Sequence, residues 1–202
     1  MSNKFIIFDL ETTGLGKSTE ICQIGAVSDS SDFSIYVIPK YDISPNASAV
    51  NHLSKSDDQL YFRGEKVNSS NPSQAFTEFF QWLTTLQTSE DDKIILVAHN
   101  AFNFDAPVLI NNLLMSGHHC GNIHGFVDTI QSFKIFFPEL KSFSLKNIMN
   151  QFGLDGDDQT HEALQDAKDL KNVGQKAAKL KGVSFEEFIM QGFKEIEDIS
   201  LS

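Results

Sequence analysis

Apolar residues along the chain form short continuous runs separated by polar, turn-forming segments. The first run, Lys4 to Leu10, is rich in β-branched and aromatic side chains, which predicts a central strand covered on both faces of a sheet. The runs from Ile21 to Val27 and from Phe33 to Ile38 follow after serine- and aspartate-rich turns, so this part of the chain predicts a three-stranded meander. Residues 94–98 predict another buried strand, and residues 125–127 predict a short strand.

Other apolar positions recur at helical spacing behind recognisable caps. Asn71 and Pro72 provide an N-cap and a first helical position for a helix that its apolar stripe extends to about Leu86. Caps and periodicity predict further helices over 107–115, 144–152 and 162–180, and a final amphipathic helix after the Ser184 and Glu187 capping box.

The order of these elements defines the expected fold class. A meander followed by alternating strands and helices is typical of an α/β fold with a mixed central β-sheet flanked by α-helices. Pro39 and Pro45 predict a loop, and residues 63–72 predict a flexible connection. A chain of 202 residues is expected to form one compact unit, with a main domain over 1–182 and the final helix, 183–202, packed on or extending it.

Composition limits the partners and the compartment. The net charge of −11 argues against extended, tight coating of duplex nucleic acid but is compatible with binding of a strand end. Apolar runs fall short of the roughly 18 residues of a membrane helix, and Cys22 and Cys120 stand apart, so an intracellular protein of the cytoplasm or nucleus without a membrane partner is expected. A solvated helix face and a phosphate patch both remain open for Lys168, Lys171, Lys176, Lys179 and Lys181.

Two carboxylates end the first predicted strand. Asp9 and Glu11 are two residues apart, so the period of a strand directs both side chains to the same sheet face. Like charges so close together favour a neutralising cation, and oxygen ligands suit Mg²⁺ or Mn²⁺. The alternative is an ordinary solvated pair at a strand end.

Three more residues have types suited to the same chemistry. Asp105 lies two residues before the helix expected from Pro107, where a simple N-cap is the alternative. Asp166 lies in the first turns of the helix 162–180, and His161 precedes it by five residues, which on a helix is about 500°. His161 is therefore expected in the loop before the helix. There it could take a proton from a water molecule or be an idle surface residue.

The motifs at 8–15, 99–105 and 161–167 together resemble the three motifs of the DEDDh (DnaQ-like) 3′→5′ exonucleases. They read Phe-Asp-Leu-Glu-Thr-Thr-Gly-Leu, His-Asn-Ala-Phe-Asn-Phe-Asp and His-Glu-Ala-Leu-Gln-Asp-Ala. The resemblance spans about residues 4–180 and includes the segment 43–54, where His52 replaces a common glycine. The sequence looks most similar to the three-prime repair exonucleases and to the exonuclease-like domain of a promyelocytic leukaemia protein isoform.

The resemblance implies an RNase H-like fold and release of nucleoside 5′-monophosphates from nucleic acid 3′ ends. Single-stranded DNA is the favoured substrate, although the motifs do not report whether DNA or RNA, or a single strand or a duplex, is preferred. It assigns two Mg²⁺ or Mn²⁺ ions and a general base to the five motif residues, the ligands being Asp9, Glu11, Asp105 and Asp166 and the base being His161. It further assigns Thr12 to the terminal 3′-OH, Leu15 to the last base, and Asn100 and Phe104 to substrate contacts.

Several alternatives remain at this point. Thr12 and Leu15 also suit a strand-end turn with Leu15 in the core, and Asp128 before Thr129 is expected to be a helix cap. The rival function is a catalytically silent nucleic-acid- or protein-binding domain on the same fold. An endonuclease or transferase on this fold is a third possibility.

Overall fold

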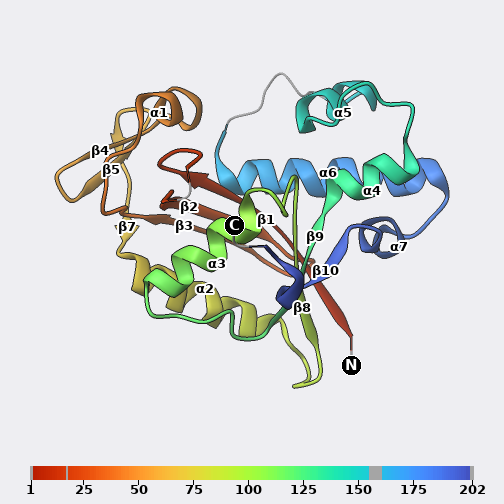
Figure 1. Ribbon diagram of the computed structural model, residues 1–202, viewed down its shortest axis with the longest axis horizontal. Coiled ribbons are helices and arrows are strands. Elements are labelled where there is room, and N and C mark those ends of the chain that lie inside the picture. Colours follow the sequence, from red (N-terminus) through yellow and green to blue (C-terminus); the bar gives the residue numbers. More distant parts are fainter. Residues whose placement is uncertain (1, 17, 155–160, 201–202) are drawn as a thin grey trace.

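The computed structural model describes residues 2–16, 18–154 and 161–200, and a mixed β-sheet forms its centre (Figure 1). Within these ranges the sheet has seven strands in the order β10-β9-β8-β1-β2-β3-β7. Their bounds are β1 (Asn3–Thr12), β2 (Ile21–Val27), β3 (Asp32–Val37), β7 (Ser69–Ser70), β8 (Lys93–Ala98), β9 (Ile123–Asp128) and β10 (Phe193–Glu195).

The central position of β1 follows from its apolar run. Both of its neighbours are buried strands, β2 on the antiparallel side and β8 on the parallel side. β1, β2 and β3 pair in chain order as the predicted meander, and β9 continues the parallel side after β8. The α/β class with a mixed sheet is therefore confirmed.

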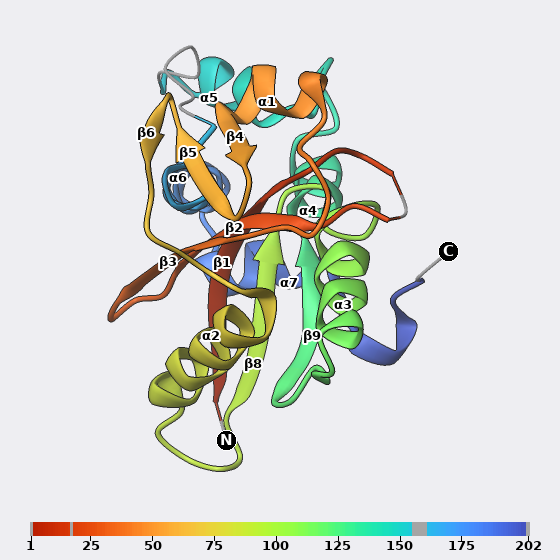
Figure 2. The ribbon, with the colours of Figure 1, turned by 90° about the vertical axis from the view of Figure 1, so that its left-hand side faces the viewer.

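Helices cover both faces of the sheet (Figures 1 and 2). On one face, α2 (Pro72–Leu86) and α3 (Asp105–Met115) enclose a core around Phe8 and Phe126. The other face carries α4 (Thr129–Phe136), α5 (Leu145–Gln151), α6 (Ala163–Lys181) and α7 (Phe185–Met190). The predicted caps Asn71, Ser144 and Ser184 accept hydrogen bonds from the first turns of α2, α5 and α7. The elements are thus largely those that the apolar pattern predicts.

A small module between β3 and α2 was not anticipated. It comprises α1 (Pro45–Asn51) and a separate sheet of β4 (Leu53–Ser56), β5 (Gln59–Phe62) and β6 (Glu65–Lys66). The loop expected around Pro45 is wrong there, because Pro45 opens α1 behind the cap Ser44, and the flexible connection over 63–72 is wrong because it holds β6 and β7. These elements are too short to show a period. Figure 2 places the module at the end of the sheet where β1 finishes.

Two element boundaries also need correction. α3 begins at Asp105 rather than Pro107, so Asp105 is its first residue and not its N-cap. The long final helix is wrong as well: α7 has six residues, and β10 and the 3-10 turn η1 (Ile196–Asp198) follow. Gly192 allows this change of direction, because a Cβ there would lie 2.2 Å from the Asp128 carbonyl oxygen. Residues 201–202 of the predicted helix lie outside the described residues.

Among the helices in the described ranges, none is long and apolar enough to cross a membrane.

Candidate active site

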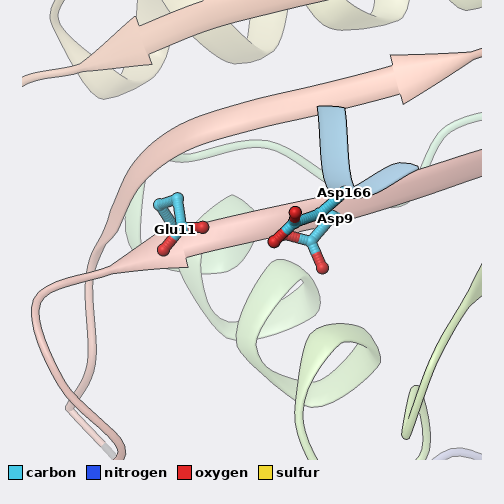
Figure 3. A group of neighbouring side chains, drawn as sticks. All are labelled: Asp9, Glu11 and Asp166. Carbon is cyan, nitrogen blue, oxygen red and sulfur yellow. The ribbon is translucent and has the colours of Figure 1, made fainter. Parts of the chain in front are cut away.

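Three carboxylates from two distant parts of the chain meet at the end of β1 (Figure 3). Asp9 and Glu11 project from the same face of β1, as their spacing predicts, and Asp166 reaches them from the first turn of α6. One oxygen atom from each side chain lies within 4.8 Å of those of the other two. The structure therefore brings the first and third motifs together.

The close approach of α6 to the sheet requires a residue without a side chain on β2. Gly25 on β2 is the register partner of Asp9, and the backbone of α6 passes directly over it. A Cβ at Gly25 would lie 2.1 Å from the Leu164 amide nitrogen, which is closer than non-bonded atoms can approach. Only glycine lets the start of this helix rest on the strand. The same contact therefore brings Asp166, in the first turn of the helix, to the site.

Asp105 stands beside this group rather than inside it. Its side chain is buried, with the residue 3% exposed, and the group of three within 4.8 Å is formed by Asp9, Glu11 and Asp166. Its charge nevertheless acts on both strand carboxylates, since it contributes to the raised pKa of Asp9 and of Glu11. The second motif thus faces the same site from the start of α3.

Electrostatics at the site favour a bound cation. Burial, followed by repulsion from neighbouring carboxylates, raises the pKa of Asp9 well above its ordinary value and that of Glu11 to about 8. Burial likewise raises the pKa of Asp105 to about 8 and that of Asp166 to about 7. Divalent cations would remove this repulsion.

The Asp166 carboxylate provides independent evidence for a cation site. Its Oδ1 atom is buried and has no hydrogen-bond partner within the described structure. A buried polar oxygen without a partner is costly unless another ligand satisfies it. An all-carboxylate set with an unpaired inward oxygen fits a hard cation such as Mg²⁺ or Mn²⁺.

His161 lies immediately before α6, as expected from its spacing to Asp166. It adopts a left-handed backbone conformation, with φ of 47°, and its Nδ1 atom is 4.0 Å from Asp166 Oδ2. Burial, together with the positive charges of His52 and Lys146, lowers the pKa of the imidazole below its ordinary value. His161 is therefore largely neutral at pH 7 and able to accept a proton.

A cavity of about 450 Å³ opens next to Glu11. Its lining includes Thr12 and Leu15 after β1, Phe104 before α3, and Val50 of α1. Leu15 is 89% exposed, so the alternative that places it in the core is wrong. The cavity brings three of the four predicted substrate contacts to one place.

The fourth predicted contact, Asn100, is held in a loop and does not line this cavity. Its backbone amide donates to Asp128 Oδ1 at 3.0 Å, and its side-chain oxygen accepts from Asn103 Nδ2 at 2.8 Å. Asp128 also caps α4 by accepting from the Ile130 amide, as expected. Asp128 therefore shapes the second-motif loop in addition to capping a helix.

Asn51 is a site residue that sequence reasoning missed. Its buried side chain donates to the Thr12 carbonyl oxygen at 3.1 Å and accepts from the Leu53 amide at 3.0 Å. A hydrogen bond from Asn51 also lowers the pKa of Glu11. The Ser44 cap before Pro45 could have indicated α1, but the helix is too short to show an apolar period, so neither α1 nor Asn51 was predicted.

Several lysines of α6 have acidic partners. Lys168 and Lys171 approach Asp32 and Asp29 at 2.9 Å, and Lys181 approaches Glu139 at 3.9 Å. These contacts favour the solvated helix face over the phosphate patch.

A mixed sheet with helices on both faces and a carboxylate cluster at the end of its central strand defines the RNase H-like class of nucleic-acid-processing folds. The RNase T exonuclease family model matches residues 6–173. The chain therefore belongs to this exonuclease family, which is DnaQ-like and of the DEDDh type.

Individual relatives agree with this family assignment. The chain is 32% identical over 158 residues to DNA polymerase III subunit epsilon of Treponema pallidum, covering 74% of this chain. It is 27% identical over 174 residues to DNA polymerase III PolC-type of Clostridium perfringens, covering 82% of this chain. The chain spans 65% of the length of the first relative and 10% of the second.

A solved structure shares the fold. E. coli exonuclease I in complex with a dA16 oligonucleotide superposes with a TM-score of 0.67 at 17% identity. The superposition covers 89% of this chain and 41% of exonuclease I. At this identity the likeness concerns the fold. The finer resemblance to the three-prime repair exonucleases stays a prediction.

Proposed function

We propose that the protein is a two-metal-ion 3′→5′ exonuclease that releases nucleoside 5′-monophosphates from nucleic acid 3′ ends. The observation that carries the proposal is the group of three close carboxylates at the end of β1, whose pKa values are raised, with His161 beside it. Its position next to an open cavity supports binding of a strand end. We assign this activity to residues 1–182, with 183–202 extending the same domain through the pairing of β10 with β9.

The four carboxylates would hold the cations, Mg²⁺ or Mn²⁺. Asp9, Glu11 and Asp166 offer oxygens within one small volume, and Asp105 faces them from α3. When bound, two such ions stabilise the negative charge that develops on the attacking and leaving oxygens and acidify the attacking water. The fold itself shields the carboxylates partly from bulk water, since Asp105 and Asp166 are buried and Asp9 and Glu11 are half-buried.

His161 acts as the general base in this proposal. It takes a proton from the attacking water, whose oxygen bonds to phosphorus while the bond from phosphorus to the 3′-oxygen of the preceding nucleotide breaks. That 3′-oxygen leaves with a proton from solvent, and His161 returns its own proton to solvent. The lowered pKa of His161 supports the role, because the imidazole is neutral at pH 7 and loses function only on acidification.

The cavity receives the terminal nucleoside. In this proposal the backbone at Thr12 binds the 3′-OH, and the exposed side chain of Leu15 contacts the last base together with Phe104; all three residues line the cavity. Asn100 contacts the strand from its loop. Single-stranded DNA is the favoured substrate, because relatives carry the names of DNA polymerase subunits and the structural neighbour holds a dA16 oligonucleotide.

The deciding experiment is a time course on 5′-labelled single-stranded DNA and on RNA of matching sequence, with Mg²⁺, Mn²⁺ or EDTA. A ladder that shortens from the 3′ end, depends on metal and is lost in His161→Ala is expected. Circular single-stranded DNA is the matched control, because it has no 3′ end and should stay intact. Cutting of the circle would indicate an endonuclease, and binding without release of nucleotides would indicate the silent binding domain.

A further inference from the structure

The helix that carries Asp166 begins without a side-chain cap of its own. Its N-cap residue, Glu162, makes no capping hydrogen bond to the first turn of α6. The missing acceptor comes from the sheet, because Gln23 Oε1 on β2 accepts from the Ala163 amide nitrogen at 3.2 Å. Gln23 Nε2 donates to Glu162 Oε1 at 3.1 Å, so a single amide holds both residues at the start of the helix.

The place of Gln23 in the sheet links this cap to the carboxylates. Gln23 is the register partner of Glu11, and Gly25 is the partner of Asp9. Directly opposite residues of an antiparallel pair point to the same face, so the Gln23 side chain stands beside that of Glu11. The same face of β2 therefore offers an amide that caps α6 and a glycine that gives its backbone room.

The Gln23 amide is itself fixed. The residue is 1% exposed, and Nε2 also lies 3.3 Å from Ser34 Oγ of β3, which accepts from it. Asp166 follows Ala163 by three residues and donates its amide to the Glu162 carbonyl at 3.0 Å. The cap is thus one helical turn from the carboxylate whose Oδ1 has no partner in the described structure.

We propose that Gln23 is a positioning residue that sets the start of α6 so that His161 and Asp166 stand over Asp9 and Glu11. Its role in catalysis rests on the proposed function, whereas its role in cation binding does not. Groups that orient metal ligands typically change metal affinity 10–100-fold when they are removed. Gln23 would influence cation affinity in this way although its own strand, β2, carries none of the proposed cation ligands.

The test is Gln23→Leu, which keeps the volume and removes all three side-chain hydrogen bonds, those to Ala163, Glu162 and Ser34. Free Mn²⁺ is measured by electron paramagnetic resonance during a titration of the purified chain, and we expect Mn²⁺ affinity to fall about tenfold. In the nuclease assay at saturating Mn²⁺, kcat should fall while KM for single-stranded DNA stays within about twofold, because the cavity is built by β1, α1 and Phe104.

Gln87→Leu is the matched control. Gln87 also bridges two segments, with Nε2 donating to the Asp92 carbonyl at 2.8 Å and Oε1 accepting from Asn122, and it does not line the cavity. Its loss should lower Tm and leave Mn²⁺ affinity unchanged. An equal Mn²⁺ affinity in Gln23→Leu and the wild type would overturn the proposal, whatever the change in Tm.

Exchanging the Gln23 amide and the Glu162 carboxylate provides a second test. This test does not require the Gln23→Leu variant to fold. Gln23→Glu places two carboxylates together and should weaken Mn²⁺ binding. The double variant Gln23→Glu/Glu162→Gln restores a donor and an acceptor across the same contact and should regain Mn²⁺ affinity. Failure of the double variant to recover would overturn the proposal.

Different results would contradict the exonuclease function and the positioning role of Gln23. Wild-type protein that binds Mn²⁺ but shortens no nucleic acid would contradict the exonuclease function, and the Mn²⁺ titrations would still judge Gln23. An active wild type with unchanged Mn²⁺ binding in Gln23→Leu would contradict the role of Gln23 alone.

Discussion

The candidate site has two halves that are held in different ways. Asp9 and Glu11 lie two residues apart on β1, so the geometry of one strand keeps them together. His161 and Asp166 reach the same place because α6 docks on β2, over Gly25 and beside Gln23. The strand-held half is thus a local property of the backbone, whereas the helix-held half depends on tertiary contacts between α6 and β2 and is the more easily displaced.

The largest expected effect comes from removing one carboxylate from either half. Asp9→Asn and Asp166→Asn should each lower kcat about 10³-fold, equivalent to about 4 kcal/mol, because each removes a proposed cation ligand. Nuclease assays at saturating Mn²⁺ measure this loss. Either variant retaining wild-type activity would contradict the assigned site.

The same two variants sharpen the comparison through stability. In EDTA both should have a higher Tm than the wild type, since a neutral amide replaces a carboxylate of raised pKa. The rise should be larger for Asp9→Asn, because three other site carboxylates act on Asp9, whereas the charges acting on Asp166 are those of Asp169 and Glu162. Thermal unfolding followed by circular dichroism tests this order.

Gly25→Ala should break the helix-held half. The added Cβ would meet the α6 backbone at 2.1 Å, so the helix must shift. We expect a loss of about 2 kcal/mol or more in unfolding free energy and an activity loss of about 100-fold. Gly16→Ala is the control for stability, because a Cβ at Gly16 has open space within 4 Å. A Gly25→Ala variant as stable as Gly16→Ala would show that α6 can move away from residue 25 without loss of stability.

A smaller effect is expected from pH in the absence of metal. The folded-state pKa values of Glu11, Asp105 and Asp166, about 8, 8 and 7, exceed the ordinary carboxyl values, so the folded state binds protons more tightly than the unfolded state. This stabilisation is complete below the unfolded pKa values near 4 and is lost as pH rises through 7 to 8. In EDTA, Tm should therefore fall between pH 5 and 8.5.

Metal should change that dependence. With Mg²⁺ present, the cations take over the role of the protons, so the decline of Tm with pH should become shallower. Scans in EDTA and in Mg²⁺ at matched ionic strength provide the comparison. A Tm that rises with pH in EDTA would contradict the raised pKa values.

The smallest expected effect concerns Leu15, beyond the strand-held half. Because its side chain is 89% exposed, Leu15→Ala should leave Tm unchanged. The KM for single-stranded DNA should rise about tenfold with the lost apolar contact, which corresponds to about 1.4 kcal/mol. Steady-state kinetics measure this change, and an unchanged KM would remove Leu15 from the substrate site.

Much of the site could be predicted because its parts are local. The two-residue spacing of Asp9 and Glu11 implies one face of a strand, and the five-residue spacing to Asp166 places His161 outside the helix. The caps Ser144 and Ser184 were predictable for the same reason, since a cap acts within three residues.

Other parts could not be predicted because their local signals are too weak or too short. α1 and its neighbouring strands are too short to display a period, so the wall of the cavity and Asn51 were missed. β10 was mistaken for helix because its pairing with β9 depends on Gly192 lying against Asp128.

The sequence by itself determined the class of fold, the family and the identities of the motif residues, since these reside in patterns over a few neighbouring positions. Only the tertiary structure decided that Asp166 meets Asp9, that Leu15 is exposed beside a cavity, and that Gln23 caps α6. The physical reason is that each of these depends on contacts between distant segments, whose geometry is set by packing over the whole sheet.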